Sequence, residues 1–202
     1  MIQELVDTFE ELKKYDYLID MGDKGFIIIK FKNEHFYHLA GFHKLNLDIY
    51  FPQKCISKDK KYKYIKSHTE KFENILKNQI KENQLLKQRI TTFKYIPSIF
   101  DEKHTILYNL REKNNPMSLY DGDFGLMRVF QIESNANNME DIYCLLGLKN
   151  RGLLETTYNC VPQSWMADRR PNSLVQYKKP LYIKMLAKLP LKITQHSENE
   201  DI

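Results

Sequence analysis

The sequence predicts an α+β protein in which helices come first and an antiparallel sheet follows. In the first half, apolar residues recur at the spacing of amphipathic helices, beginning with Ile2, Leu5, Val6 and Phe9. Beyond Pro97 the pattern changes to short apolar segments bounded by turn residues, which is typical of strands. Helices followed by a meander of strands indicate the α+β class.

The amino-terminal region contains three expected elements. In order, they are a helix over residues 2–19, a turn over 20–25 and a strand over 26–32. Asn33 is then expected to cap a short helix that carries His35 and His38. Gly41 is the natural end of that helix, because glycine adopts the left-handed conformation that closes many helices.

Residues 52–66 form the most basic window of the chain and are predicted to be a loop or an extended arm. Lysine ammonium groups can follow phosphates, and tyrosine rings can stack on unpaired bases, so this segment is a candidate nucleic-acid interface. The residues assigned to the interface are Lys58, Lys60, Lys61, Tyr62, Lys63 and Tyr64. The alternative is a solvated loop in a lysine-rich protein.

Two more helices and four strands are expected in the rest of the chain. One helix begins near the capping-box sequence at 67–70, and another covers 82–95. In the second helix Arg89 lies on the apolar stripe, so its guanidinium needs an anionic partner or an opening onto a cleft. The strands are predicted at 104–110, 124–132, 142–148 and 153–161, with a hairpin turn at 149–152 between the last two.

Composition indicates a soluble globular protein without a membrane anchor. The chain has 202 residues, of which 42% are hydrophobic, and no apolar run reaches the roughly 18 residues of a membrane span. The amino terminus lacks the pattern of a secretory signal, so a cytoplasmic location without membrane contact is expected. Three separated cysteines with no CxxC pair indicate neither a disulfide framework nor a thiolate zinc site. The net charge of +5 permits nucleic-acid binding without requiring it.

The segment from Phe36 to Leu45 carries the strongest chemical signal. It places His38, His43 and Lys44 close together among apolar side chains. Imidazoles titrate near neutral pH, so a pair can supply a proton acceptor and a proton donor, while a lysine can hold an anion. These groups suit metal-independent phosphodiester cleavage. A metal site that uses His35 is the alternative, but no cysteine or carboxylate lies at a familiar offset, so neither metal nor other cofactor is expected.

Several stretches resemble a phage-associated family of the Barnase–EndoU–colicin–RelE-like nuclease superfamily, its fourth phage group. The similar stretches are Phe-Ile-Ile-Ile-Lys-Phe at 26–31, the His-Leu-x-Gly-x-His-Lys-Leu segment at 38–45, the helix opening at 72–77, the Arg-Ile step at 89–90 and the strand end at 158–165. The resemblance implies helices packed on a four-stranded antiparallel sheet over residues 1–165, leaving 166–202 as a carboxy-terminal extension. It also implies RNA cleavage by a toxin or effector of a phage or other mobile element, with RNA and an antitoxin or immunity protein as partners.

Under this hypothesis His38 acts as base or acid and His43 takes the complementary role. Lys44 and Arg89 stabilise the charge of the transition state, and Ser164 hydrogen-bonds a phosphate oxygen. Each residue also has a structural interpretation. The histidines can satisfy helix carbonyls, the lysine can be solvated, the arginine can bridge to a buried carboxylate, and the serine can belong to a turn.

Two other functional classes stay open from the sequence. One is an inactive relative of the same fold that binds a nucleic acid or a protein during phage–host conflict. The other is a structural phage protein that has lost any active site, since a fold alone does not determine a function.

Overall fold

The computed structural model describes residues 1–45, 47–81, 83–101, 104–110, 122–133, 139–169 and 179–191. The helices are α1 (Ile2–Leu12), α2 (Asn33–Leu39), α3 (Lys58–Ser67), α4 (Thr69–Gln79), α5 (Gln84–Thr92) and α6 (Ile96–Ile99). The strands are β1 (Tyr15–Asp20), β2 (Phe26–Lys30), β3 (Ile106–Asn109), β4 (Phe124–Glu133), β5 (Met139–Leu154), β6 (Thr157–Asp168), β7 (Lys179–Leu181) and β8 (Met185–Pro190). Short 3-10 helices are η1 (Gly22–Lys24), η2 (Phe42–Lys44), η3 (Asp48–Tyr50) and η4 (Phe93–Tyr95).

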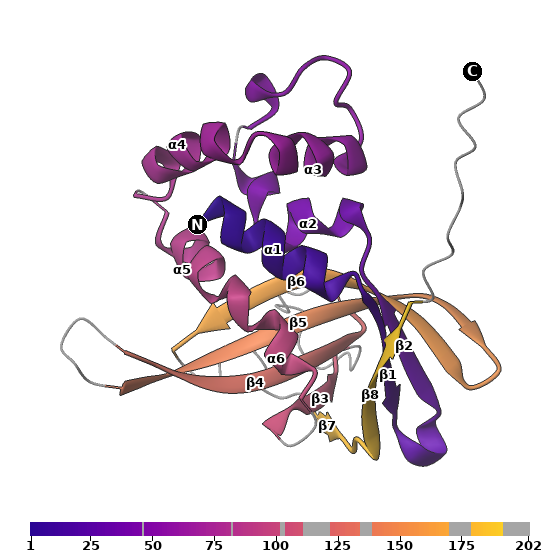
Figure 1. Ribbon diagram of the computed structural model, residues 1–202. Helices are drawn as coiled ribbons and strands as arrows, with labels where there is room; N and C mark the ends of the chain where they lie inside the picture. Colours follow the sequence, from indigo (N-terminus) through magenta and orange to yellow (C-terminus); the bar gives the residue numbers. More distant parts are fainter. Residues whose placement is uncertain are drawn as a thin grey trace, which may run out of the picture.

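The fold is α+β, but the predicted four-stranded antiparallel sheet is wrong. Within the described residues, eight strands form one mixed sheet in the order β7-β3-β4-β5-β6-β2-β1-β8. The sheet curls into a half-barrel, and Figure 1 shows the helices gathered over one side of it. Strands β2 and β6 pair in parallel, with Ile28 opposite Asn159. Two strands so far apart in sequence leave no local pattern that reveals their pairing.

The first helix is shorter than predicted, because it ends at Leu12 and Tyr15–Asp20 forms β1. Strand β1 pairs with β2 on one side and with β8 on the other, both antiparallel. Tyr17 and Ile19 are buried, in the alternating pattern of a strand with one covered face. Residues two apart share one face of a strand but lie about 200° apart on a helix, so the helical stripe that starts at Ile2 ends at Leu12.

The predicted hairpin turn at 149–152 is also wrong, since β5 continues through these residues to Leu154. The chain reverses at Glu155, a non-glycine residue with a φ of 52°. Residues with strong turn preference instead produce a bulge inside the strand, where the register of β5 and β6 shifts between Asn150 and Gly152.

The basic segment at 52–66 contains a helix rather than an extended arm. Ser57 caps α3, and its hydroxyl accepts a hydrogen bond from the Lys60 backbone at 3.3 Å. Tyr62 is buried in α3, and its ring contacts the rings of Phe9 and Phe36. This aromatic contact directs one side of the lysine-rich helix toward the core. The large number of lysines in the segment gives no indication of this buried side.

The main core lies between the helices and the sheet. Trp165 of β6 is fully buried, and its indole nitrogen donates to the Thr92 hydroxyl of α5 at 3.1 Å. A smaller cluster that includes Leu145 and Met127 covers the other face of the sheet. No helix in the described part of the chain is both long and apolar enough to cross a membrane.

Part of the predicted carboxy-terminal extension belongs to the sheet. Strand β6 continues to Asp168, and β8 forms the outer partner of β1. Residues 170–178 and 192–202 of the extension lie outside the described residues.

Candidate functional site

A cavity of about 690 Å³ opens where β2 leaves the sheet and the chain turns into α2. Its walls come from α2, the beginning of α3, and strands β2, β5 and β6. The charged and titratable residues that line it are Lys30, Lys32, Glu34, His35, His38, Lys58, Asp59 and Arg151. Four of these residues are cationic and two are carboxylates, so the cavity favours an anionic ligand.

His38 and Lys58 meet at the wall of this cavity. The Lys58 ammonium nitrogen lies 2.5 Å from Nε2 of His38. Because an ammonium group only donates, Nε2 must be unprotonated to accept this hydrogen bond. Burial lowers the pKa of His38, and the charges of Lys58 and Arg89 lower it further. His38 is therefore a neutral imidazole that can take up a proton at physiological pH.

His43 follows α2 in the 3-10 helix η2 and packs against His38. The centroids of the two rings are 4.6 Å apart, with 46° between their planes. Burial, followed by the neighbouring His38, Arg89 and Lys44, lowers the pKa of His43 to about 4. A separation this small leaves no room for a phosphate between the two rings. The two imidazoles thus form one contiguous unit rather than opposite sides of a substrate site.

Arg89 reaches from α5 to the carboxyl end of α2. Its guanidinium donates to the backbone carbonyl of His38 at 3.4 Å, where a cation complements the helix dipole. Burial lowers the pKa of Arg89, and burial together with Arg89 lowers the pKa of Lys44. In the described residues no carboxylate forms an ion pair with Arg89. The structure therefore brings His38, His43, Lys44 and Arg89 together, with His38 as the member that lines the cavity.

Gly41 makes the close approach of α5 to α2 possible. Its φ of +79° is left-handed, and a Cβ atom here would lie 2.9 Å from both Arg89 Cδ and Leu86 Cδ1. We expect Gly41→Ala to lower the free energy of unfolding by about 1–3 kcal/mol in urea denaturation, because it adds backbone strain and crowding. Gly152→Ala is the control, since nothing lies within 4 Å of its Cβ position. Equal stabilities of the two variants would contradict this explanation.

His35 has a structural contact that His38 lacks. Its Nδ1 accepts a hydrogen bond from the Lys32 backbone at 2.9 Å, which satisfies a free amide at the start of α2. Burial is the main cause that lowers the pKa of His35 to about 4. Among the described residues, no three histidine, cysteine or carboxylate side chains are grouped to hold a metal ion.

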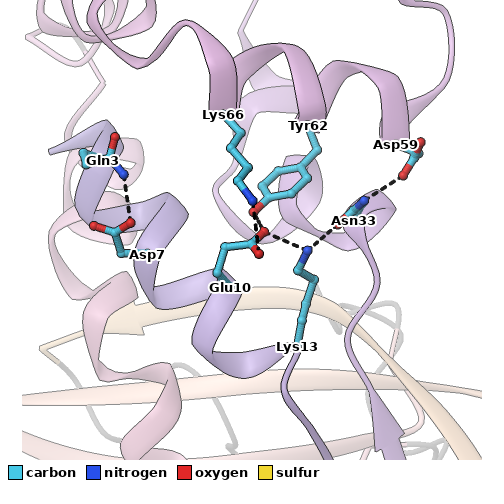
Figure 2. Close-up of polar contacts among 8 residues, drawn as sticks. All are labelled: Gln3, Asp7, Glu10, Lys13, Asn33, Asp59, Tyr62 and Lys66. Carbon is cyan, nitrogen blue, oxygen red and sulfur yellow. Dashed lines mark hydrogen bonds and ion pairs between the residues drawn. The ribbon is translucent and has the colours of Figure 1, made fainter. Parts of the chain in front are cut away.

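A polar network around Glu10 holds the body of α3 against α1 (Figure 2). The Glu10 carboxylate accepts a hydrogen bond from the Tyr62 hydroxyl and forms ion pairs with Lys13 at 2.7 Å and Lys66 at 3.3 Å. Burial opposes the charge of this carboxylate, but hydrogen bonds from Lys13 and Tyr62 hold the pKa of Glu10 below its ordinary value.

A second branch of the network fixes the first turn of α3. Asn33, at the start of α2, accepts a hydrogen bond from Lys13 at 2.7 Å and donates one to Asp59 at 2.8 Å (Figure 2). Asp59 directly follows Lys58 in the chain. Asn33 therefore joins the two helices at the point where Lys58 and His38 face each other, although it is not the cap predicted for α2.

The other lysines assigned to a nucleic-acid interface do not line this cavity. Lys61 binds Asp48 at 2.6 Å and lies over the Tyr37 ring, and Lys63 pairs with Asp59 at 3.0 Å. Lys60 is exposed on α3. Of the six residues assigned to the interface, Lys58 is the one that lines the cavity.

The two tyrosines of the predicted interface pack inward. Tyr62 is 1% exposed, so its ring has no free face for a base. Tyr64 is half-buried and stacks on His68 with the ring centroids 4.1 Å apart. Both rings stabilise the helical layer.

Ser164 does not line the cavity. It lies opposite Gly147 in the β5–β6 pair, and its hydroxyl occupies the space that a side chain at Gly147 would fill. Its neighbour Trp165 faces α5, and successive side chains in a strand point to opposite faces. The structure thus separates Ser164 from the histidine pair.

Sequence patterns do not reveal the sheet wall of the cavity. Arg151, Asn159 and Gln163 line this wall. Arg151 and Gln163 have no opposite residue in the pairing of β5 with β6. Their nearness to His38 depends on the parallel pairing of β2 and β6. A turn-like Asn-Arg-Gly inside a strand is the one local signal that could have indicated a bulge.

Comparison with protein families identifies a match over most of the chain, while neither the curated proteins nor the solved structures contain a significant match. The family model that matches residues 1–184 is described as phage-Barnase-EndoU-ColicinE5/D-RelE like nuclease4, abbreviated PBECR4. This result confirms the resemblance seen in the histidine segment and extends it beyond residue 165 to include β7. The chain therefore belongs to the PBECR4 family of phage-associated nuclease-like proteins.

Proposed function

We propose that the protein is an endoribonuclease that cleaves RNA by acid–base catalysis without a metal, as a toxin or effector of a phage or mobile element. The observation that carries this proposal is the contact of a neutral imidazole, His38, with an ammonium group, Lys58, at the wall of a cation-rich cavity. Family membership supports the nuclease class. RNA is the proposed substrate because its 2′-hydroxyl supplies the nucleophile that such a pair can activate.

In the proposed reaction, Nε2 of His38 removes the proton from the ribose 2′-hydroxyl. The 2′-oxygen forms a bond to the adjacent phosphorus as the bond from phosphorus to the 5′-oxygen breaks. The Lys58 ammonium turns from Nε2 to the phosphate, stabilises its added negative charge and protonates the departing 5′-oxygen. The products are a 2′,3′-cyclic phosphate and a 5′-hydroxyl.

His43, Lys44 and Arg89 position His38 or add positive charge near it. Because the His43 ring is in contact with the His38 ring, we assign His43 a positioning role and give the acid role to Lys58. Arg89 anchors the backbone of His38, and both Arg89 and Lys44 add positive potential that attracts the phosphate.

The first test is incubation of the purified protein with matched RNA and DNA oligonucleotides in excess chelator. We expect cleavage of RNA and none of DNA, because the deoxyribose lacks the nucleophile. Binding of RNA without cleavage would instead favour an inactive binding module of the same fold. Cleavage that the chelator abolishes would contradict the metal-free mechanism.

The pH dependence follows from the lowered pKa of His38. A base must be unprotonated, so kcat/KM should rise with pH through the pKa of His38 and level off above it. Burial and the charge of Lys58 lower this pKa, so the midpoint of the rise is expected below the ordinary histidine value of 6.5. A pH–rate profile of the wild type measures it, and a midpoint well above 6.5 would contradict the assignment of the base.

A further inference from the structure

Two β-bulges supply residues to the sheet wall of the cavity. The register of β5 and β6 passes from Asn150 to Gly152 and from Pro162 to Ser164, so Arg151 and Gln163 have no opposite residue. Both line the cavity that holds His38 and Lys58. Bulges redirect side chains out of the regular ladder and are frequent beside active sites, so this coincidence indicates a built binding surface.

Among the described strands, none pairs with the edge of β6 beside these bulges on the β2 side. Pairing of β2 with β6 ends at Ile29 opposite Cys160, whereas β6 continues to Asp168. Strand β2 stops there because the chain leaves the sheet to form α2. The register places Ile28 beside Asn159, and alternation places Val161 on the same face. The wall therefore combines apolar surface with amide groups.

The polar side chains of this wall are not engaged elsewhere in the described part of the chain. No hydrogen bond or ion pair there uses the side chains of Arg151, Asn159 or Gln163. Of the two carboxylates in the lining, Asp59 is already bound to Asn33 and Lys63. The guanidinium is thus available for a phosphate, and an amide with adjacent donor and acceptor atoms can match the edge of a nucleobase.

We propose that the two bulges form a nucleotide-selective subsite, in which the Gln163 amide reads the edge of one base and Arg151 holds the neighbouring phosphate. The inference rests on the proposed ribonuclease function and extends it, since it makes the substrate an unpaired RNA segment with a preferred base next to the cleaved bond. Unpaired bases expose the edges that such an amide can read.

The test separates binding from cleavage. Binding is measured with four 2′-O-methyl homopolymer oligonucleotides, which lack the nucleophile, and cleavage sites are mapped on an RNA of random sequence. The wild type should prefer one base in both measurements, by about tenfold for one amide–base pair. Gln163→Leu should remove the preference, whereas the exposed Gln131→Leu on β4 should keep it. Arg151→Gln should reduce the slope of log affinity against log salt by about 0.7.

The outcomes distinguish the two proposals. Base-selective binding that depends on Gln163, without cleavage of RNA, would support the subsite and contradict the ribonuclease function. Cleavage with no base preference, or with a preference unchanged in Gln163→Leu, would overturn the subsite and leave the ribonuclease function in place. An unchanged salt slope in Arg151→Gln would overturn the role of Arg151.

Discussion

Replacing His38 by alanine is expected to lower the rate of RNA cleavage by about 10²–10⁴-fold, the usual contribution of a positioned general base. The imidazole is half-buried at the cavity wall, and within the described part of the chain Lys58 contacts no other histidine ring nitrogen. The effect should appear in kcat more than in KM, because the proton is transferred in the transition state. Single-turnover cleavage of a labelled RNA measures it.

His68→Ala is the matched control. His68 is an exposed imidazole between α3 and α4 that stacks on Tyr64 and does not line the cavity. Its removal should leave the cleavage rate within about threefold of the wild type, because a substitution on the surface away from the cavity usually has a small effect on the protein. Equal losses in His38→Ala and His68→Ala, with both variants folded by circular dichroism, would remove His38 from the mechanism.

Replacing Lys58 by methionine is expected to reduce cleavage by about 10²–10³-fold, the effect of removing one electrostatic stabiliser of the transition state. Methionine keeps much of the aliphatic length but has neither the charge nor the proton. The change also removes a cation that lowers the pKa of His38, so the acid limb of the pH–rate profile should move to higher pH. The shift reports the charge of Lys58 beside His38, whereas the loss of rate reports the part of Lys58 in the transition state.

Lys60→Met is the control for Lys58→Met. Lys60 belongs to the same helix and is exposed, but it does not line the cavity. The control variant should keep the position of the acid limb and nearly the full rate. If Lys58→Met left both the rate and the profile unchanged, the contact between Lys58 and His38 would be incidental to the chemistry.

Sequence patterns predicted the elements that depend on interactions between residues close together in the chain. The alternating Ile27 and Ile29 of β2 are buried as expected, and Gly41 takes the left-handed conformation predicted at the end of α2. Helices α4 and α5 fall within the predicted segments, although Leu85 of α5 is 70% exposed. These features depend on neighbours along the chain, which a sequence pattern contains.

Long-range pairing was not predictable in the same way. The parallel contact of β2 with β6 and the addition of β8 beside β1 join distant segments, so the predicted sheet was too small. For the candidate site, the closeness of His38 to His43 follows from their spacing around Gly41. The approach of Lys58 to His38 depends on the contacts of Glu10 and Asn33 between helices. These contacts join distant segments, so the pattern of a single segment does not predict them.

The most direct test of the proposed mechanism is analysis of the ends produced by cleavage in chelator. The substrate is a DNA strand that contains ribonucleotides at only a few internal positions, because cleavage should then occur solely after a ribose. We predict 2′,3′-cyclic phosphate and 5′-hydroxyl ends at those positions, lost in His38→Ala. Cleavage at deoxyribose positions, or 3′-hydroxyl and 5′-phosphate ends, would contradict activation of the 2′-hydroxyl by His38.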